Sequence, residues 1–111
     1  MNLNEITNIF KDCEINIEKI IVKSSDLVRT IDFISNNYRF GMLKDITAVD
    51  NRENGIELIY RLFSPENAED AVISTSVKDG ETESVSGIFD SAIADEKEIY
   101  DLFGIKFSGN E

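Results

Sequence analysis

The side chains that could do chemistry in this chain are carboxylates, lysines and tyrosines, because the sequence contains no histidine and a single cysteine. Histidine is the usual general base, the usual partner of a nucleophilic serine or cysteine, and a common zinc ligand. Iron–sulfur clusters are normally held by four cysteines. The composition therefore disfavours nucleophilic catalysis and redox centres, and we expect no catalytic, cofactor-binding or metal-binding residues.

Paired carboxylates are the main chemistry that remains, and Asp45 and Asp50 are an example. Two close carboxyl groups can divide acid and base roles between them. Successive side chains of a strand point to opposite faces, and these two residues have opposite parity. An enzyme that uses this pair is therefore disfavoured by the sequence.

Length and composition favour one soluble globular domain that spans residues 1–111, because 41% of the residues are hydrophobic and 30% are charged. Cys13 cannot form an internal disulfide, and we expect it to be a half-buried hydrophobe rather than a nucleophile. The start of the sequence lacks the basic and apolar regions of a secretory signal, which predicts a cytoplasmic protein. No apolar run approaches the roughly 20 residues that span a bilayer, so we expect membrane association only through a partner.

The charge of the chain is strongly negative and uneven. The 22 acidic and 11 basic residues give a net charge of −11, which excludes a general nucleic-acid binder because phosphate contacts need clustered lysine and arginine. Residues 79–101 contain eight acids and one base, Lys97. Such a surface is either a solvated face that aids solubility or a docking face for a basic partner.

The spacing of apolar residues predicts a two-layer α+β sandwich. We expect, in chain order, a helix over residues 3–12, a strand over 15–23, a helix from 25 or 26 to 38, and strands over 41–50, 56–63 and 71–78. The Asn54-Gly55 pair is the strongest hairpin signal. In the strand over 56–63, Leu58, Tyr60 and Leu62 share one face, which indicates a core side. This order of elements predicts helices on one face of a mixed, mostly antiparallel sheet of about four strands.

After Gly80 the apolar spacing changes to a helical one. Ser84 can cap a single turn, and either Ser91 or Asp95 opens the last helix. If Asp95 is the N-cap, Glu98 stands three residues later as its capping partner. Gly104 is placed to end the helix.

Two separate motifs in this sequence resemble one known family. Residues 95–109 read DEKEIYDLFGIKFSG, which is similar to the signature of the 30 kDa subunit of complex I, the C subunit of NADH:quinone oxidoreductase: Glu-Arg-Glu, two residues, Asp, two apolar residues and Gly-Ile. Residues 45–50 read DITAVD and resemble the central hairpin of the same family. The spacing from Ser84 through Phe89 to Glu96 also matches it without a gap. The resemblance covers residues 40–64 and 84–109.

The sequence departs from the family pattern at three points. Lys97 stands where the family prefers arginine, which keeps the charge but loses the bidentate fork. Asn110 stands where a histidine usually follows Gly109. Residues 1–111 do not include the long C-terminal arm of the family, so we expect either a short version, similar to those in membrane-bound nickel–iron energy-converting hydrogenases, or a truncated form of a longer chain.

The resemblance implies an accessory subunit that holds no redox centre and docks on the large catalytic subunit of the peripheral arm. It also implies the small iron–sulfur subunit as a further neighbour, and a position on the inner face of the cell membrane through these partners. We expect three acids to face basic groups of the large subunit and three apolar residues to lie at or beside the interface. These residues are Glu96, Glu98, Asp101, Phe103, Ile105 and Phe107.

Two alternatives remain for the acidic helix and for the chain. Acids near a helix N-terminus stabilise the helix by about 0.3–1 kcal/mol each, and for Glu98 this effect alone can account for the residue. The chain itself could be a stand-alone acidic adaptor that has kept the fold without the complex.

Overall fold

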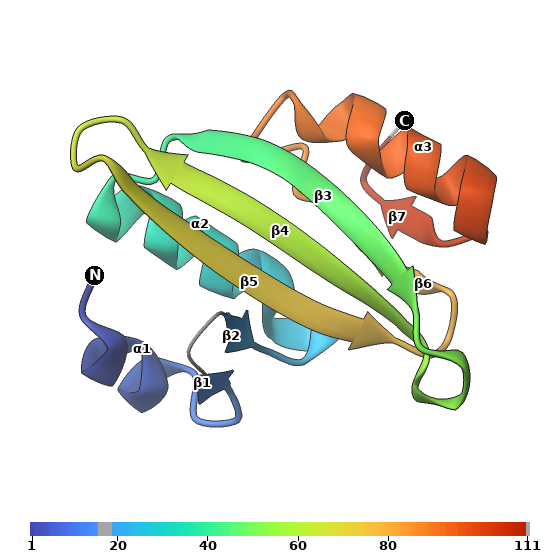
Figure 1. The fold of residues 1–111 in the computed structure, drawn as a ribbon, viewed down its shortest axis with the longest axis horizontal. Helices are drawn as coiled ribbons and strands as arrows, with labels where there is room; N and C mark the ends of the chain where they lie inside the picture. Colours follow the sequence, from blue (N-terminus) through green and yellow to red (C-terminus); the bar gives the residue numbers. More distant parts are fainter. Residues whose placement is uncertain (16–18, 111) are drawn as a thin grey trace.

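The computed structural model describes residues 1–15 and 19–110, and its elements are shown in Figure 1. The helices described are α1 (Leu3–Ile9), α2 (Leu27–Tyr38) and α3 (Ala92–Phe103), with the short 3-10 helices η1 (Ser24–Asp26) and η2 (Arg52–Asn54). The strands described are β1 (Glu14–Ile15), β2 (Ile20–Ile21), β3 (Met42–Asp50), β4 (Ile56–Ser64), β5 (Glu69–Val77), β6 (Glu81–Glu83) and β7 (Lys106–Ser108).

The main sheet has five strands in the order β1-β2-β5-β4-β3. Strands β3, β4 and β5 form two consecutive antiparallel hairpins, β2 runs parallel to β5, and β1 is antiparallel to β2. The loop between β3 and β4 needs a glycine at Gly55, where φ is +85° and a Cβ would stand 2.6 Å from the Val77 carbonyl oxygen. The hairpin predicted at this position is confirmed.

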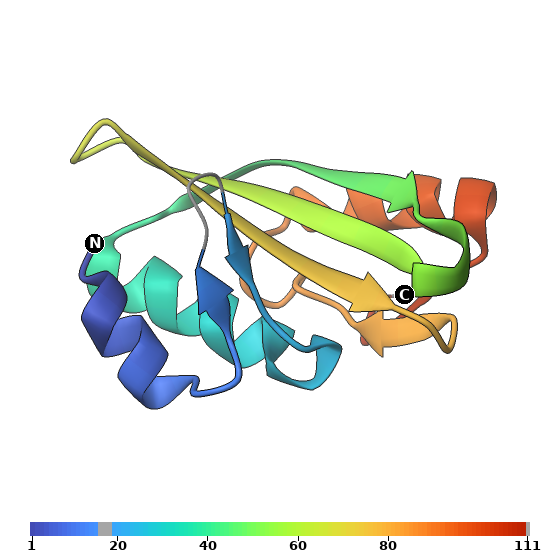
Figure 2. The ribbon, with the colours of Figure 1, turned by 60° about the horizontal axis from the view of Figure 1, so that its bottom comes forward.

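The core fills the space between one face of this sheet and the helices α1 and α2, whose arrangement Figure 2 shows, and it continues into the segment after β6 through buried residues such as Val85, Ile99 and Ile105. On α2 the buried apolar residues Leu27, Ile31 and Ile34 follow the helical repeat, and on β4 Leu58 and Tyr60 alternate with partly exposed neighbours. The other face of the sheet is left without a helix over it in the described part of the chain. The predicted two-layer α+β class is therefore confirmed, with a mixed and mostly antiparallel sheet.

The N-terminal strand prediction is only partly right. Instead of one strand over residues 15–23, the structure has the short antiparallel strands β1 and β2, which pair Glu14 with Ile21 and Ile15 with Ile20. A run of β-branched residues indicates extended backbone but cannot show that the chain reverses within the run. Ile17, which the prediction placed inside the strand, lies outside the described residues.

A second structural unit follows the main sheet, and we call residues 81–110 the C-terminal unit. Within it β6 and β7 form a parallel pair in which Thr82 is opposite Phe107, and α3 packs against β3 and β7 (Figure 1). This pair was not predicted, because three residues are too few to show an alternating pattern. None of the helices described has the length and apolar character that crossing a bilayer requires.

Candidate docking surface

Helix α3 begins at Ala92, one turn earlier than the Asp95 alternative requires. The chain before it is already turning, because the Phe89 amide donates to the Val85 carbonyl at 3.0 Å and the Ala92 amide donates to the Phe89 carbonyl at 3.0 Å. The helix therefore grows out of this turn, and the proposed capping box of Asp95 with Glu98 is wrong. The predicted end is confirmed, since Gly104 takes the left-handed conformation with φ +75°.

The first turn of α3 covers part of the free edge of β3. The Ser91 hydroxyl donates to the Leu43 carbonyl at 3.5 Å, and Asp95 lies close enough to the backbone of Ile46 for that amide to act on the pKa of its carboxyl group. Burial and then the charges of Asp45 and Glu98 raise the pKa of Asp95, while the amide of Ile46 lowers it. Free backbone groups on an edge strand invite pairing with other chains, so α3 protects this edge and is in turn fixed in place by it.

The carboxylate of Glu96 holds the C-terminal unit together from inside. Glu96 is 0% exposed. Its Oε2 atom accepts the Val85 amide at 2.9 Å, and its Oε1 atom accepts the Ser84 hydroxyl at 2.5 Å and the Asn110 side-chain amide at 2.9 Å. Hydrogen bonds to a charged group contribute about 1.5–3 kcal/mol each. Glu96 thus joins α3, the turn after β6 and the segment after β7.

The surroundings of Glu96 are those of a buried anion satisfied by neutral donors. The hydroxyl of Tyr60 on β4 is also buried, and the pKa of Tyr60 is raised first by burial and then by the negative charge of Glu96. Buried charges are retained only where hydrogen bonds replace the lost hydration. The three donors to Glu96 do so, which makes this residue a structural anchor of α3.

Three of the six residues predicted at the partner interface therefore lie inside this chain. Besides Glu96, Ile105 is 1% exposed and Phe107 is 8% exposed. The sequence contained the signal for Glu96, because Ala92, Glu96 and Ile99 are spaced by four and three residues and share one helical stripe. That stripe is the one that faces the core.

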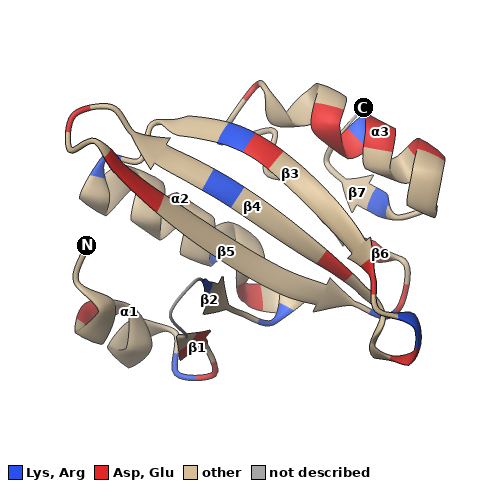
Figure 3. Ribbon diagram, viewed as in Figure 1, with Lys and Arg blue, Asp and Glu red and all other residues tan. Residues whose placement is uncertain are grey.

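The other three predicted residues are exposed on α3, with Phe103 at the last position of the helix, four residues after the buried Ile99. Glu98 and Asp101 are exposed, and Phe103 is 37% exposed. Leu102, which the sequence argument did not single out, is 70% exposed. We call Glu98, Asp101, Leu102 and Phe103 the outer face of α3. Figure 3 shows acidic residues along this helix, which stands at one side of the main sheet.

Exposed apolar side chains gather on α3 more than elsewhere in the described chain. Of the eight large hydrophobic residues that are exposed, four belong to this helix: Ile93, Tyr100, Leu102 and Phe103. Isolated exposed apolar residues are ordinary, but a cluster on one element is typical of an interaction site. These four side chains make α3 the candidate docking surface of the described chain.

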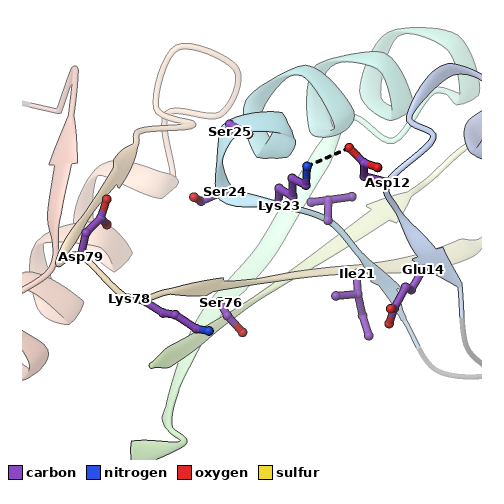
Figure 4. A pocket seen from close by; sticks show the side chains of 10 residues that line it. Asp12, Glu14, Ile21, Lys23, Ser24, Ser25, Ser76, Lys78 and Asp79 are labelled. Carbon is purple, nitrogen blue, oxygen red and sulfur yellow. Dashed lines mark hydrogen bonds and ion pairs between the residues drawn. The ribbon is translucent and has the colours of Figure 1, made fainter. Parts of the chain in front are cut away.

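A groove of about 550 Å³ lies beside the ends of β2 and β5. Figure 4 shows that Lys23 and Asp12 point toward each other across it, and their Nζ and Oδ2 atoms are 2.8 Å apart. This pairing lowers the pKa of Asp12 and raises that of Lys23. The remaining charges on its walls, Glu14, Lys78 and Asp79, are of both signs and exposed. We interpret this groove as solvated surface.

The carboxylate pair considered for catalysis does not form. Asp45 contacts Arg61 at 3.5 Å, whereas Asp50 accepts the Arg52 backbone amide at 2.8 Å in the following turn. Five residues along one strand separate the two by roughly 16 Å. Among the described residues no group of three or more potential ligands is placed to hold a metal ion. Cys13 is partly buried, and burial raises the pKa of its thiol.

Comparison with known proteins gives one consistent family. The family model described as "Respiratory-chain NADH dehydrogenase, 30 Kd subunit" matches residues 20–111. The NADH-quinone oxidoreductase C subunit of Geotalea uraniireducens is 32% identical over 95 residues, which are 82% of this chain and 58% of that protein. A NADH-quinone oxidoreductase C/D subunit of Aquifex aeolicus is 32% identical over 83 residues, which are 73% of this chain and 14% of that protein.

Solved structures show the same fold. The trypsin-resistant fragment of Nqo5 superposes with a TM-score of 0.87 at 22% identity, over 98% of this chain and 94% of that one. A chain of the membrane-bound sulfane sulfur reductase, an archaeal respiratory membrane complex, superposes with a TM-score of 0.82 at 24% identity, over 98% of this chain and 69% of that one. At these identities the likeness establishes the fold.

Proposed function

This chain belongs to the family of the 30 kDa subunit of respiratory-chain NADH dehydrogenase, and we propose that it is an accessory, non-redox subunit of a membrane-associated oxidoreductase of the complex I type. In this proposal it docks on the large catalytic subunit of the peripheral arm. Its contribution is to stabilise the assembly, while the reaction takes place in other subunits.

The outer face of α3 is the observation that carries the proposal. Leu102 and Phe103 remain exposed beside the exposed acids Glu98 and Asp101, on a helix that Glu96 holds in place. Apolar contacts at the centre of an interface supply affinity, and charges around them steer the encounter and fix the orientation. We therefore assign this face to basic groups of the large subunit and assign Glu96 to positioning the helix.

The identity of the partner is supported by relatives in which two subunits are one protein. The Aquifex aeolicus relative is named as a C/D subunit, and this chain corresponds to 14% of its length. A similar C/D subunit is found in Acidiphilium cryptum. Covalent linkage raises the effective concentration of two domains that act together. The fusion therefore favours the D subunit as the partner of this chain.

The position of the chain in the cell is proposed on the same basis. One structural relative belongs to a membrane-bound respiratory complex, whereas the helices described in this chain are not suited to cross a bilayer. We propose peripheral attachment on the inner face of the cell membrane through the large subunit. The small iron–sulfur subunit is a further proposed neighbour, which rests on the family resemblance.

Co-purification from the source organism tests this function. A tagged wild-type chain is expected to bring down the D-subunit homologue, and the Glu98→Lys/Asp101→Lys variant is expected to lose most of it. The control variant Asp32→Lys/Glu53→Lys makes the same change in net charge at two exposed acids of α2 and η2 and should bind like the wild type. Recovery of an unrelated protein would favour a stand-alone adaptor, and equal recovery by the first variant would exclude the assigned face.

A further inference from the structure

The turn between β3 and β4 places a side-chain amide next to a backbone nitrogen that can attack it. Asn54 is the last residue of η2, and Gly55 follows it directly. Figure 1 shows this turn at the end of the main sheet, in the loop that joins the two strands. The Asn54 side chain is exposed, and within residues 1–15 and 19–110 it makes no hydrogen bond. Its amide carbon is therefore open to attack and to water.

The reaction that this arrangement allows is deamidation, with water as the co-reactant. The Gly55 nitrogen bonds to Cγ of Asn54, the bond from Cγ to Nδ2 breaks, and ammonia leaves with the proton of the Gly55 amide. The succinimide ring that results is then opened by water. If the ring bond to Cγ breaks, the product is aspartate, and if the ring bond to the main-chain carbonyl carbon breaks, the product is isoaspartate. In both cases one amide and one water become one carboxyl group and one ammonia.

The residue that follows the asparagine decides where this reaction is possible. Glycine has no Cβ beside its nitrogen, so it allows the close approach that ring closure needs. Asn54 is the one asparagine of the sequence that precedes a glycine. Asn51 is exposed in the same turn but precedes Arg52, whose side chain hinders the approach. The sequence thus provides a reactive asparagine and a matched unreactive one three residues apart.

In the closed turn the attacking nitrogen is occupied, so the turn must open before the reaction. The Gly55 amide donates to the Arg52 carbonyl at 3.0 Å. Two features favour opening at this place. Arg52 has a left-handed backbone with φ +57°, which is unfavourable for a residue with a Cβ, and residues 51–54 are all exposed. Exposed turns with few buried contacts open locally while the rest of the sheet stays folded.

We propose that Asn54 is a site of spontaneous modification, at which the folded chain is converted to aspartate and isoaspartate through local opening of this turn. The proposal does not depend on the docking function. Isoaspartate adds one carbon atom to the main chain where the Asn51 amide donates to the Gly55 carbonyl at 2.9 Å and where Gly55 lies against the Val77 carbonyl. Both products add a negative charge beside Glu53 in a chain whose net charge is already −11. The converted chain should therefore melt at a lower temperature.

Peptide mapping by mass spectrometry tests the site in the folded chain during incubation at neutral pH. Asn51 serves as the internal control, because it is exposed in the same turn. We expect aspartate and isoaspartate to accumulate at Asn54 while Asn51 stays intact. The same chain unfolded in urea shows that the assay detects the reaction when the turn is fully open. Conversion at Asn54 in urea without conversion in the folded chain, or equal conversion at the two asparagines of the folded chain, would overturn the proposal.

A pair of variants tests whether opening of the turn controls the rate. Asp50→Ala removes the carboxylate that accepts the Arg52 amide at 2.8 Å, so the turn should open more often and conversion at Asn54 should become about two- to tenfold faster. The matched control Asp45→Ala removes another exposed acid of β3 away from the turn and should leave the rate unchanged. Equal rates in the wild type and Asp50→Ala would contradict the proposed route.

Discussion

Helices α2 and α3 have the same length of 12 residues but use their apolar residues differently. In α2, all of whose residues are described, no large apolar side chain is exposed, because Leu27, Ile31 and Ile34 face the sheet. Helix α3 buries Ile99 but leaves four large apolar side chains exposed. The large apolar residues of α2 therefore pack in the core of the chain, whereas most of those of α3 remain on its surface. This difference is the basis on which we propose α3, and not α2, as the docking helix.

Truncation of one apolar residue on each helix should separate these two uses most clearly. Ile31→Ala removes a fully buried side chain and should lower the free energy of unfolding by about 2–5 kcal/mol. Leu102→Ala removes a side chain that is 70% exposed, and should change it by less than about 0.5 kcal/mol. Urea unfolding followed by circular dichroism measures both. A loss of more than about 2 kcal/mol in Leu102→Ala would mean that Leu102 itself is buried in solution.

The next largest change in the free energy of unfolding is expected at Glu96, whose hydrogen bonds hold α3 in place. Glu96→Ala leaves the Val85 amide, the Ser84 hydroxyl and the Asn110 amide without their acceptor, and should cost about 2–4 kcal/mol.

Glu96→Gln keeps the size of the side chain but has one acceptor oxygen instead of two, so an intermediate loss is expected. Thermal unfolding of the wild type, Glu96→Gln and Glu96→Ala measures the order of their stabilities. A Glu96→Ala variant as stable as the wild type would show that the carboxylate does not anchor the C-terminal unit.

The ion pair between Lys19 and Glu57 predicts that the stability of the fold depends moderately on pH. The hydrogen bond from Lys19 is the main reason that the pKa of Glu57 lies below its usual value of 4.5. Since the folded pKa is depressed, this pair stabilises the fold above about pH 4.5, and the stabilisation is lost as the pH falls through the folded pKa. The wild type should exceed Glu57→Gln in stability by about 0.2–1 kcal/mol at pH 7. The difference between their melting temperatures should shrink as the pH falls below about 4.5, and a difference that grows on acidification would contradict this assignment.

The smallest effect is expected at the junction of α3 with β3. The pKa of Asp95 is raised by burial and by neighbouring acids, so the ionised form is disfavoured in the folded state. The contribution of Asp95 to the stability of the fold is therefore greatest at low pH, where its carboxyl group is protonated, and is lost as the pH rises through the folded pKa. Asp95→Asn keeps the size of the side chain and removes the charge. It should raise the melting temperature slightly at pH 7 and have no such effect at pH 3.

The regular parts of the fold could be predicted because each depends on a local repeat. The stripe of Ile31 and Ile34 predicts α2, the alternation of Leu58 and Tyr60 predicts β4, and Gly104 predicts the end of α3. Such patterns report which side of an element is buried, and the structure confirms them.

The C-terminal unit could not be predicted to the same extent because its contacts join distant residues. Pairing of Thr82 with Phe107 brings together segments that are far apart in the sequence, and it places Asn110 beside Glu96. The acidic signature alone could not separate Glu96, which faces inward, from Glu98, which faces outward. The spacing of Ala92, Glu96 and Ile99 makes that distinction once α3 is known to begin at Ala92, because all three then lie on one helical stripe.

Side-chain footprinting of the complex tests the central claim most directly. Hydroxyl-radical labelling compares the free chain with the chain bound to the D-subunit homologue, at Leu102 and Phe103 on α3 and at Met42 and Val49 on β3, all of which are exposed in the free chain. We predict that labelling of Leu102 and Phe103 falls in the complex while that of Met42 and Val49 stays the same. Protection of the β3 residues with unchanged labelling of α3 would contradict the account.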